Sequence, residues 1–134
     1  MRTLYDPESD VLIDGVLQTL EVLKEHRYRM CLVSRKEGQR QEKIHDLGIA
    51  HFFEEMHLVE DKQEAMEAIK KKHMQRKLWV VGDRVRGEIA VGNRIGAITV
   101  WFKNGAFRGE EPVHSDEYPD FTITSFSEFL KLLT

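Results

Sequence analysis

The sequence has one cysteine, three prolines, no long apolar run and no excess of positive charge. A single cysteine, Cys31, excludes an internal disulfide and fits a reducing compartment. No run approaches the roughly 20 apolar residues of a membrane span, and the first ten residues hold no signal-peptide core. A net charge of −3 argues against a nucleic-acid partner. We therefore expect a cytoplasmic protein that binds neither membranes nor nucleic acids.

The chain instead shows apolar, strand-like runs that alternate with amphipathic stretches. Its 134 residues predict a single domain over 1–134. Asp14 is predicted to cap the first helix, and Gly48 to end the second. The alternation favours an α/β fold, a doubly wound, mainly parallel sheet with helices on both faces. Strands are predicted at 28–34, 55–60, 77–83, 97–102 and 121–125, and helices at 14–26, 36–48, 61–73, 86–96 and 126–133.

Ligands of such folds bind at the carboxyl ends of the strands, and two acids lie at one of these ends. Asp83 ends a buried strand, and Glu88 follows five residues later. Two carboxylates at a strand-to-helix turn suit a hard cation such as Mg²⁺. The alternative is structural, with Asp83 capping the next helix and Glu88 interacting with its dipole.

Lys62 and Ser34 follow two other predicted strands. A lysine in the first turn of a helix is unfavourable by several tenths of a kcal/mol, about 0.3–1, unless an anion lies nearby. The alternative is that Lys62 is solvated beside Asp61 or Glu60. Ser34 precedes Arg35 and the next helix, which suits a phosphate group; the alternative is a simple helix cap.

Two other residue types give weaker signals. The six histidines show no i, i+4 pair of the kind that predicts a zinc site, and we expect most of them at the surface. Cys31 is predicted to be a small core residue in the middle of a strand.

Four segments, in this order and spacing, resemble the haloacid dehalogenase-like (HAD-like) hydrolase superfamily. The resemblance runs from about residue 11 to the C-terminus and implies a Rossmann-like core; no cap domain is visible in the sequence, so we expect none within it. It also implies Mg²⁺-dependent, phosphatase-type hydrolysis of a small phosphorylated molecule. The segments are "LVS" (32–34), "EDK" (60–62), "VVGDRVRGEIAVGNRIGAITVWF" (80–102) and "YPDFTITSFSEFLKLL" (118–133).

The resemblance assigns roles to four of the residues above. Ser34 would bond a phosphoryl oxygen, and Lys62 would offset the negative charge of the phosphate and the nucleophile. Asp83 would bind Mg²⁺. Glu88 stands where the family more often has aspartate, and would hold the metal or its water.

The family's nucleophile motif, an apolar strand followed by Asp-x-Asp-x-Thr, is not clearly present. Its nearest match is "MRTLYDPES", with Asp6 as nucleophile and Glu8 as the second acid. The preceding strand is short and polar, and eight residues separate Asp6 from Gly15. Two hypotheses follow: an enzyme that uses Asp6 or a segment outside this chain, or a catalytically inactive HAD-like domain that binds a ligand or partner. A phospho-receiver domain has a similar topology, but the acidic pair that it requires is not found.

The family's nucleophile strand would lie between the strands predicted at 28–34 and 77–83. Unless that position is filled, both strands keep unpaired backbone groups, each costing about 1–3 kcal/mol. Residues 1–5 or a strand from a second copy are candidates to fill it, which makes a homodimer or strand exchange an expectation. Alternatively, residues 1–10 are the remnant of a longer N-terminal part, since "YDPESDVLIDGV" resembles the linker that returns from a cap insertion.

Overall fold

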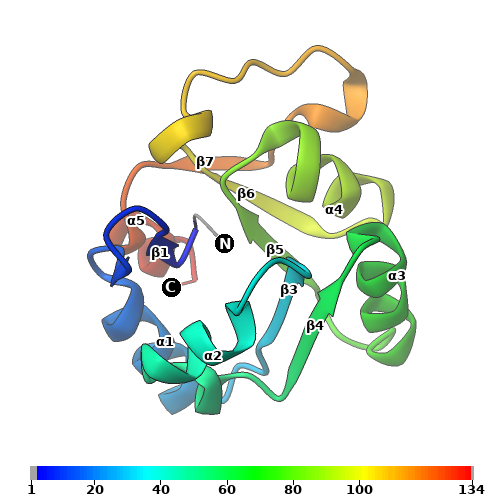
Figure 1. Cartoon of the computed structure of the whole chain (residues 1–134). Helices are drawn as coiled ribbons and strands as arrows, with labels where there is room; N and C mark the ends of the chain where they lie inside the picture. Colours follow the sequence, from blue (N-terminus) through cyan, green and yellow to red (C-terminus); the bar gives the residue numbers. More distant parts are fainter. Residues whose placement is uncertain (1–2, 134) are drawn as a thin grey trace.

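Strands and helices alternate along the chain in the computed structural model, which describes residues 3–133 (Figure 1). None of the helices within this range is long and apolar enough to cross a bilayer. The strands are β1 (Tyr5–Asp6), β2 (Val11–Leu12), β3 (Cys31–Arg35), β4 (Glu55–Val59), β5 (Trp79–Gly82), β6 (Ile98–Phe102) and β7 (Phe121–Ile123). The α-helices are α1 (Val16–Glu25), α2 (Arg40–Asp46), α3 (Lys62–Lys72), α4 (Ala90–Arg94) and α5 (Phe126–Leu132). Short helical turns are η1 (Ala50–Phe52), η2 (Val85–Ile89), η3 (Gly105–Phe107) and η4 (Ser115–Glu117).

The predicted α/β class and the parallel pairing are confirmed. Strand β3 pairs in parallel with β4, and β5, β6 and β7 form a parallel sheet in that order. Helices α1, α2 and α5 lie on one side of the strands, and α3 and α4 on the other (Figure 1). The sheet is nevertheless divided, because within residues 3–133 no strand pairs with both β3 and β5.

The larger apolar core lies between the strands and helices α1, α2 and α5. Gly15 begins α1 with a φ of +85°, and no side chain caps this helix, so the predicted cap at Asp14 is wrong. A side chain at Gly15 would also approach Phe126 Cβ at 3.3 Å, so glycine allows both the turn and the contact with α5. The buried members of this core are Val16, Leu20, Leu32, Ile44, Ile49, Phe52, Val100, Phe102, Ile123, Phe126 and Phe129.

The N-terminal segment forms a hairpin of its own. Tyr5 and Asp6 pair antiparallel with Leu12 and Val11, and the amide of Ile13 donates to the carbonyl of Leu4. The expectation that residues 1–5 form the central strand is therefore wrong for residues 3–5, whereas residues 1 and 2 lie outside the described residues. The turn's own hydrogen bonds and the burial of the Tyr5 ring stabilise this hairpin.

A largely apolar cavity of about 320 Å³ lies between β3 and β5, at the predicted position of the central strand. Residues of both strands line it, with side chains from α1, α3 and α5. Trp79, Val80 and Val81 of β5 are consequently half-buried, although a fully buried strand was expected. Strand β6 has a neighbour on each side and is almost completely buried.

Candidate active site

The turn after β5 brings two acids together. The backbone of Gly87 leaves helical geometry inside η2, and Glu88 thereby returns towards the end of β5. A Cβ at Gly82 would lie 2.7 Å from Glu88 Cβ and 3.1 Å from its carboxyl carbon, closer than real atoms approach. Glycine at position 82 therefore makes room for the Glu88 side chain beside the end of the strand.

Asp83 is 3% exposed, and its carboxylate is incompletely paired. Oδ1 accepts a hydrogen bond from Thr3 Oγ1 at 3.3 Å, whereas Oδ2 is buried without a partner among the described residues. Burial, together with the negative charge of Glu88, raises the pKa of Asp83 above its ordinary value. A buried, unpaired carboxylate oxygen is costly, so a bound cation at this position would be favourable.

Lys62 reaches across to the same turn. Its Nζ donates to Glu88 Oε1 at 2.9 Å, and both side chains are largely buried. The alternative of a solvated Lys62 is therefore wrong; Asp61 instead caps α3 by accepting from the amides of Gln63 and Glu64. Because α3 follows β4 and Glu88 follows β5, this ion pair joins the two parts of the divided sheet. Glu88 Oε2 is buried without a partner in the described chain.

Ser34 lies at the same edge of the sheet, near the end of β3. It is fully buried, and its Oγ accepts a hydrogen bond of 2.6 Å from Nη1 of Arg40. Helix α2 begins after Gln39, so the alternative of Ser34 as a helix cap is also wrong. Arg40 was not predicted from the sequence, where its only local signal is a cation at the start of the helix that follows this strand. Arg40 also pairs with Glu37 Oε2 at 3.1 Å, so its guanidinium must exchange this exposed partner to bind an anion together with the Ser34 hydroxyl.

Asp6 lies in the N-terminal hairpin and is exposed. Its two carboxylate oxygens accept hydrogen bonds from the amide of Glu8 at 2.9 Å and from the hydroxyl of Ser9 at 3.1 Å. Across residues 3–133, no hydrogen bond or ion pair joins Asp6 to Lys62, Asp83 or Glu88. The structure thus brings Lys62, Asp83 and Glu88 together, and places Asp6 in a separate local network.

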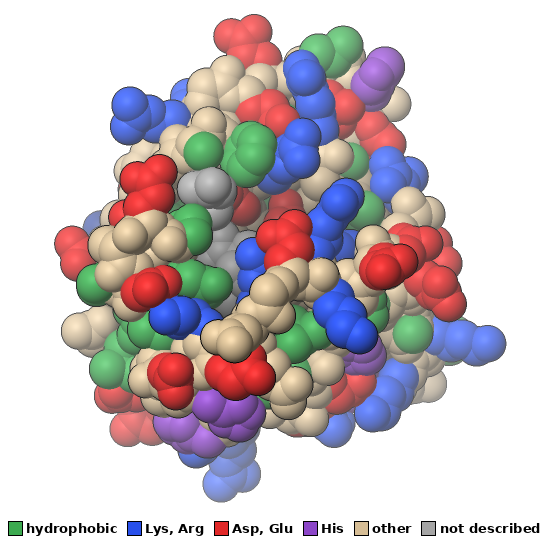
Figure 2. Space-filling view, in the orientation of Figure 1, with side chains coloured by type: hydrophobic (Ala, Val, Ile, Leu, Met, Phe, Trp, Pro, Cys, Tyr) green, Lys and Arg blue, Asp and Glu red, His purple; other side chains and the backbone are tan. Residues whose placement is uncertain are grey.

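These groups define what the site can do chemically. Acidic and basic side chains gather around a hollow near the middle of the face shown in Figure 2. Two carboxylates, each with one buried oxygen that has no partner among the described residues, form a hard donor set that fits Mg²⁺. The Lys62 ammonium and the Ser34–Arg40 pair supply positive charge and hydrogen-bond donors suited to a phosphoryl group.

The fold is that of a HAD-like core. A model of the HAD-hydrolase-like family matches residues 60–129. The chain therefore belongs to the HAD-like hydrolase family, as the resemblance predicted. The matched segment includes Lys62, Asp83 and Glu88, whereas Asp6 and Ser34 precede it.

Two curated relatives share the name glyceraldehyde 3-phosphate phosphatase. The protein from Methanopyrus kandleri is 32% identical over 127 residues, which cover 88% of this chain and 54% of the relative. The protein from Pyrococcus furiosus is 29% identical and is matched over 90% of this chain and 54% of its own length. The chain spans about half the length of these relatives.

Solved structures show the same fold. The HAD-hydrolase YfnB from Bacillus subtilis, a structure bound to magnesium, superposes with a TM-score of 0.75 at 21% identity and covers 93% of this chain and 57% of its own. A HAD phosphatase from Thermococcus onnurineus superposes with a TM-score of 0.71 at 18% identity, covering 91% and 58%. At these identities the likeness establishes the fold alone.

Proposed function

We propose that this chain carries the metal- and phosphate-binding half of a Mg²⁺-dependent, HAD-type phosphatase site. The observation that carries the proposal is the pair of carboxylates of Asp83 and Glu88, each with one buried oxygen unpaired within residues 3–133, beside the Lys62 ammonium. The names of the two curated relatives support phosphate-ester hydrolysis and a small phosphorylated substrate.

Each side chain has a distinct task in this proposal. Asp83 and Glu88 hold Mg²⁺, which when bound supplies positive charge against the phosphoryl oxygens. Lys62 binds a phosphoryl oxygen while it keeps its ion pair with Glu88. Ser34 donates its hydroxyl proton to a second oxygen, and Arg40, which now bonds Ser34, adds charge.

The reaction also needs a carboxylate nucleophile. Its oxygen attacks phosphorus as the P–O ester bond breaks, and the leaving oxygen takes a proton from an acid or water to give the alcohol. Water then hydrolyses the acyl phosphate, which releases inorganic phosphate and regenerates the carboxylate. Asp6 can act as the nucleophile only if the hairpin opens, because both of its carboxylate oxygens accept hydrogen bonds within the turn. The other source is a segment outside this chain whose strand enters the cavity between β3 and β5.

The second candidate function is a catalytically inactive HAD-like domain that binds a ligand or a partner. The exposed position of Asp6 and the local hydrogen bonds of its carboxylate favour this candidate. A single core domain over 1–134, a cytoplasmic location, a homodimer and the absence of membrane and nucleic-acid partners remain predictions.

Phosphate release separates these candidates. The whole chain is assayed with Mg²⁺ on para-nitrophenyl phosphate and on glyceraldehyde 3-phosphate, beside Asp6→Asn. Asp10→Asn is the matched control, because Asp10 is an exposed acid of the same hairpin. Turnover lost in Asp6→Asn but kept in the control identifies Asp6 as nucleophile. Mg²⁺ binding without turnover supports the inactive domain or an absent nucleophile strand, whereas a folded chain without Mg²⁺ binding contradicts the metal site.

A further inference from the structure

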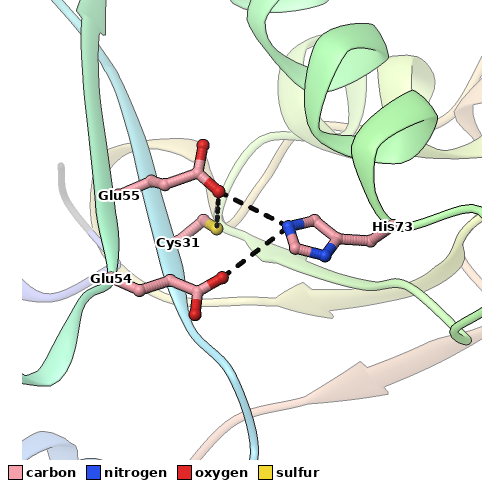
Figure 3. A group of neighbouring side chains, drawn as sticks. All are labelled: Cys31, Glu54, Glu55 and His73. Atoms are coloured by element: carbon pink, nitrogen blue, oxygen red, sulfur yellow. Dashed lines mark hydrogen bonds and ion pairs between the residues drawn. The ribbon is translucent and has the colours of Figure 1, made fainter.

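A second cluster of ligating side chains lies at the opposite end of the parallel strands. Cys31 begins β3, Glu55 begins β4 directly beside it, Glu54 precedes β4, and His73 follows the last residue of α3. All four side chains converge on one point (Figure 3). Cys31 is half-buried at the edge of the sheet, so its predicted place in the middle of a core strand is wrong.

The spacing of the donor atoms is that of a small coordination shell. His73 Nε2 lies 3.4 Å from Glu55 Oε2 and 3.6 Å from Glu54 Oε1, and Cys31 Sγ lies 3.8 Å from Glu55 Oε2. One ligand atom from each residue falls within 4.8 Å of all the others. Tetrahedral Zn²⁺ with bonds of about 2.0–2.3 Å has neighbouring ligand atoms about 3.3–3.8 Å apart. Three separations already match this geometry, so small side-chain movements complete it.

The two carboxylates are oriented by partners outside the cluster. Glu54 Oε2 accepts from Arg29 Nε at 2.8 Å, and Glu55 Oε1 lies 3.0 Å from His57 Nε2. Each acid thereby turns its other oxygen towards His73 (Figure 3). Outer hydrogen bonds of this kind position ligating carboxylates in metal sites.

We propose that Cys31, Glu54, Glu55 and His73 form a zinc site. Thiolate and imidazole ligands select Zn²⁺ over Mg²⁺, which requires oxygen ligands. The bound ion would join β3, β4 and the end of α3, beside the cavity that Cys31, Glu54 and His73 also line.

The Lys72 ammonium and the protons on the ligand atoms compete with the metal, and both can be displaced. Lys72 Nζ lies 3.2 Å from Glu55 Oε2, but its side chain is 60% exposed and can turn into solvent. Burial, followed by the charges of Glu55 and Glu54, raises the pKa of the Cys31 thiol to about 11. A metal ion must therefore displace a proton from the sulfur, as it does at other thiolate sites.

Metal titration tests the proposal on the whole chain after removal of metal with a chelator. We expect one Zn²⁺ per chain by calorimetry, and Co²⁺ should give a thiolate-to-cobalt charge-transfer band with tetrahedral visible bands. Cys31→Ser should abolish the charge-transfer band, and Cys31→Ser and His73→Gln should each weaken Zn²⁺ binding at least about tenfold.

Matched variants separate this site from others. His51→Gln changes an exposed histidine of η1, and Asp83→Asn changes the candidate Mg²⁺ site; both should keep the Zn²⁺ affinity. If Cys31→Ser fails to fold by circular dichroism, Glu54→Gln takes its place, because Glu54 is exposed. Unchanged Zn²⁺ affinity in the cluster variants, a Co²⁺ spectrum without the thiolate band, or no Zn²⁺ binding by the folded chain would each overturn the proposal.

Discussion

The two ends of the parallel strands present different chemistry. At the carboxyl ends, the hard oxygens of Asp83 and Glu88 lie beside an ammonium; at the amino ends, sulfur and imidazole join two carboxylates. Helix α3 contributes to both, with Lys62 as its first residue and His73 just after its last. Its 11 residues correspond to about 16 Å of helix, which keeps the two clusters apart. The two proposed cation sites thus differ in their ligands, with hard oxygens at one end and sulfur, nitrogen and oxygen at the other.

The largest effect that should separate the two ends comes from Asp83→Asn. An amide binds a hard cation more weakly than a carboxylate, so we expect about a hundredfold loss of Mg²⁺ affinity, or about 2.8 kcal/mol of binding free energy. Calorimetry with Mg²⁺ and then with Zn²⁺ measures the metal affinity at the carboxyl ends and at the amino ends of the strands. Unchanged Mg²⁺ affinity would remove Asp83 from the metal site, and a parallel loss of Zn²⁺ binding would show that the ends are not independent.

Gly82→Ala should disturb the carboxyl ends alone. The added methyl group would meet Glu88 at 2.7 Å, so Glu88 must move and the free energy of unfolding should fall by about 1–3 kcal/mol. Mg²⁺ affinity should fall with it. Urea unfolding measures the first effect, and Gly109→Ala is the control, because nothing lies within 4 Å of a Cβ at that position. Equal stability of the two variants would contradict the close approach of Glu88.

The smallest effect concerns pH. Burial and Glu88 raise the pKa of folded Asp83 above 3.8, so the folded state favours the protonated acid. This contribution to stability is full below pH 3.8 and is lost as the pH rises through the raised value. As the pH rises through this window, the unmodified chain should therefore lose stability relative to Asp83→Asn. Saturating Mg²⁺ should offset this difference in unfolding free energy. A difference in unfolding free energy that does not change with pH would show that the Asp83 pKa is not raised.

The fold could be predicted from the sequence because apolar runs and helical periodicity are local signals. Lys62, Asp83 and Glu88 could be grouped because the carboxyl ends of parallel strands meet at one edge. Their proposed roles remain predictions, as does the role of Ser34.

The rest depends on contacts that no local pattern encodes. The hydrogen bond between Arg40 and Ser34 depends on the direction of the Arg40 side chain. Cys31 and His73 are 42 positions apart in the sequence and are brought together by the connection from β4 through α3. A search for an i, i+4 histidine pair could not detect that cluster. The half-burial of β5 likewise depends on whether a neighbouring strand is present.

The cavity between β3 and β5 separates the two parts of the sheet. Within residues 3–133, no backbone ladder links the β3–β4 pair to the β5–β6–β7 sheet. Side-chain packing and the Lys62–Glu88 ion pair carry that connection instead. We therefore expect the two parts of the sheet to open more independently than a continuous sheet would, and a strand that entered the cavity to couple them.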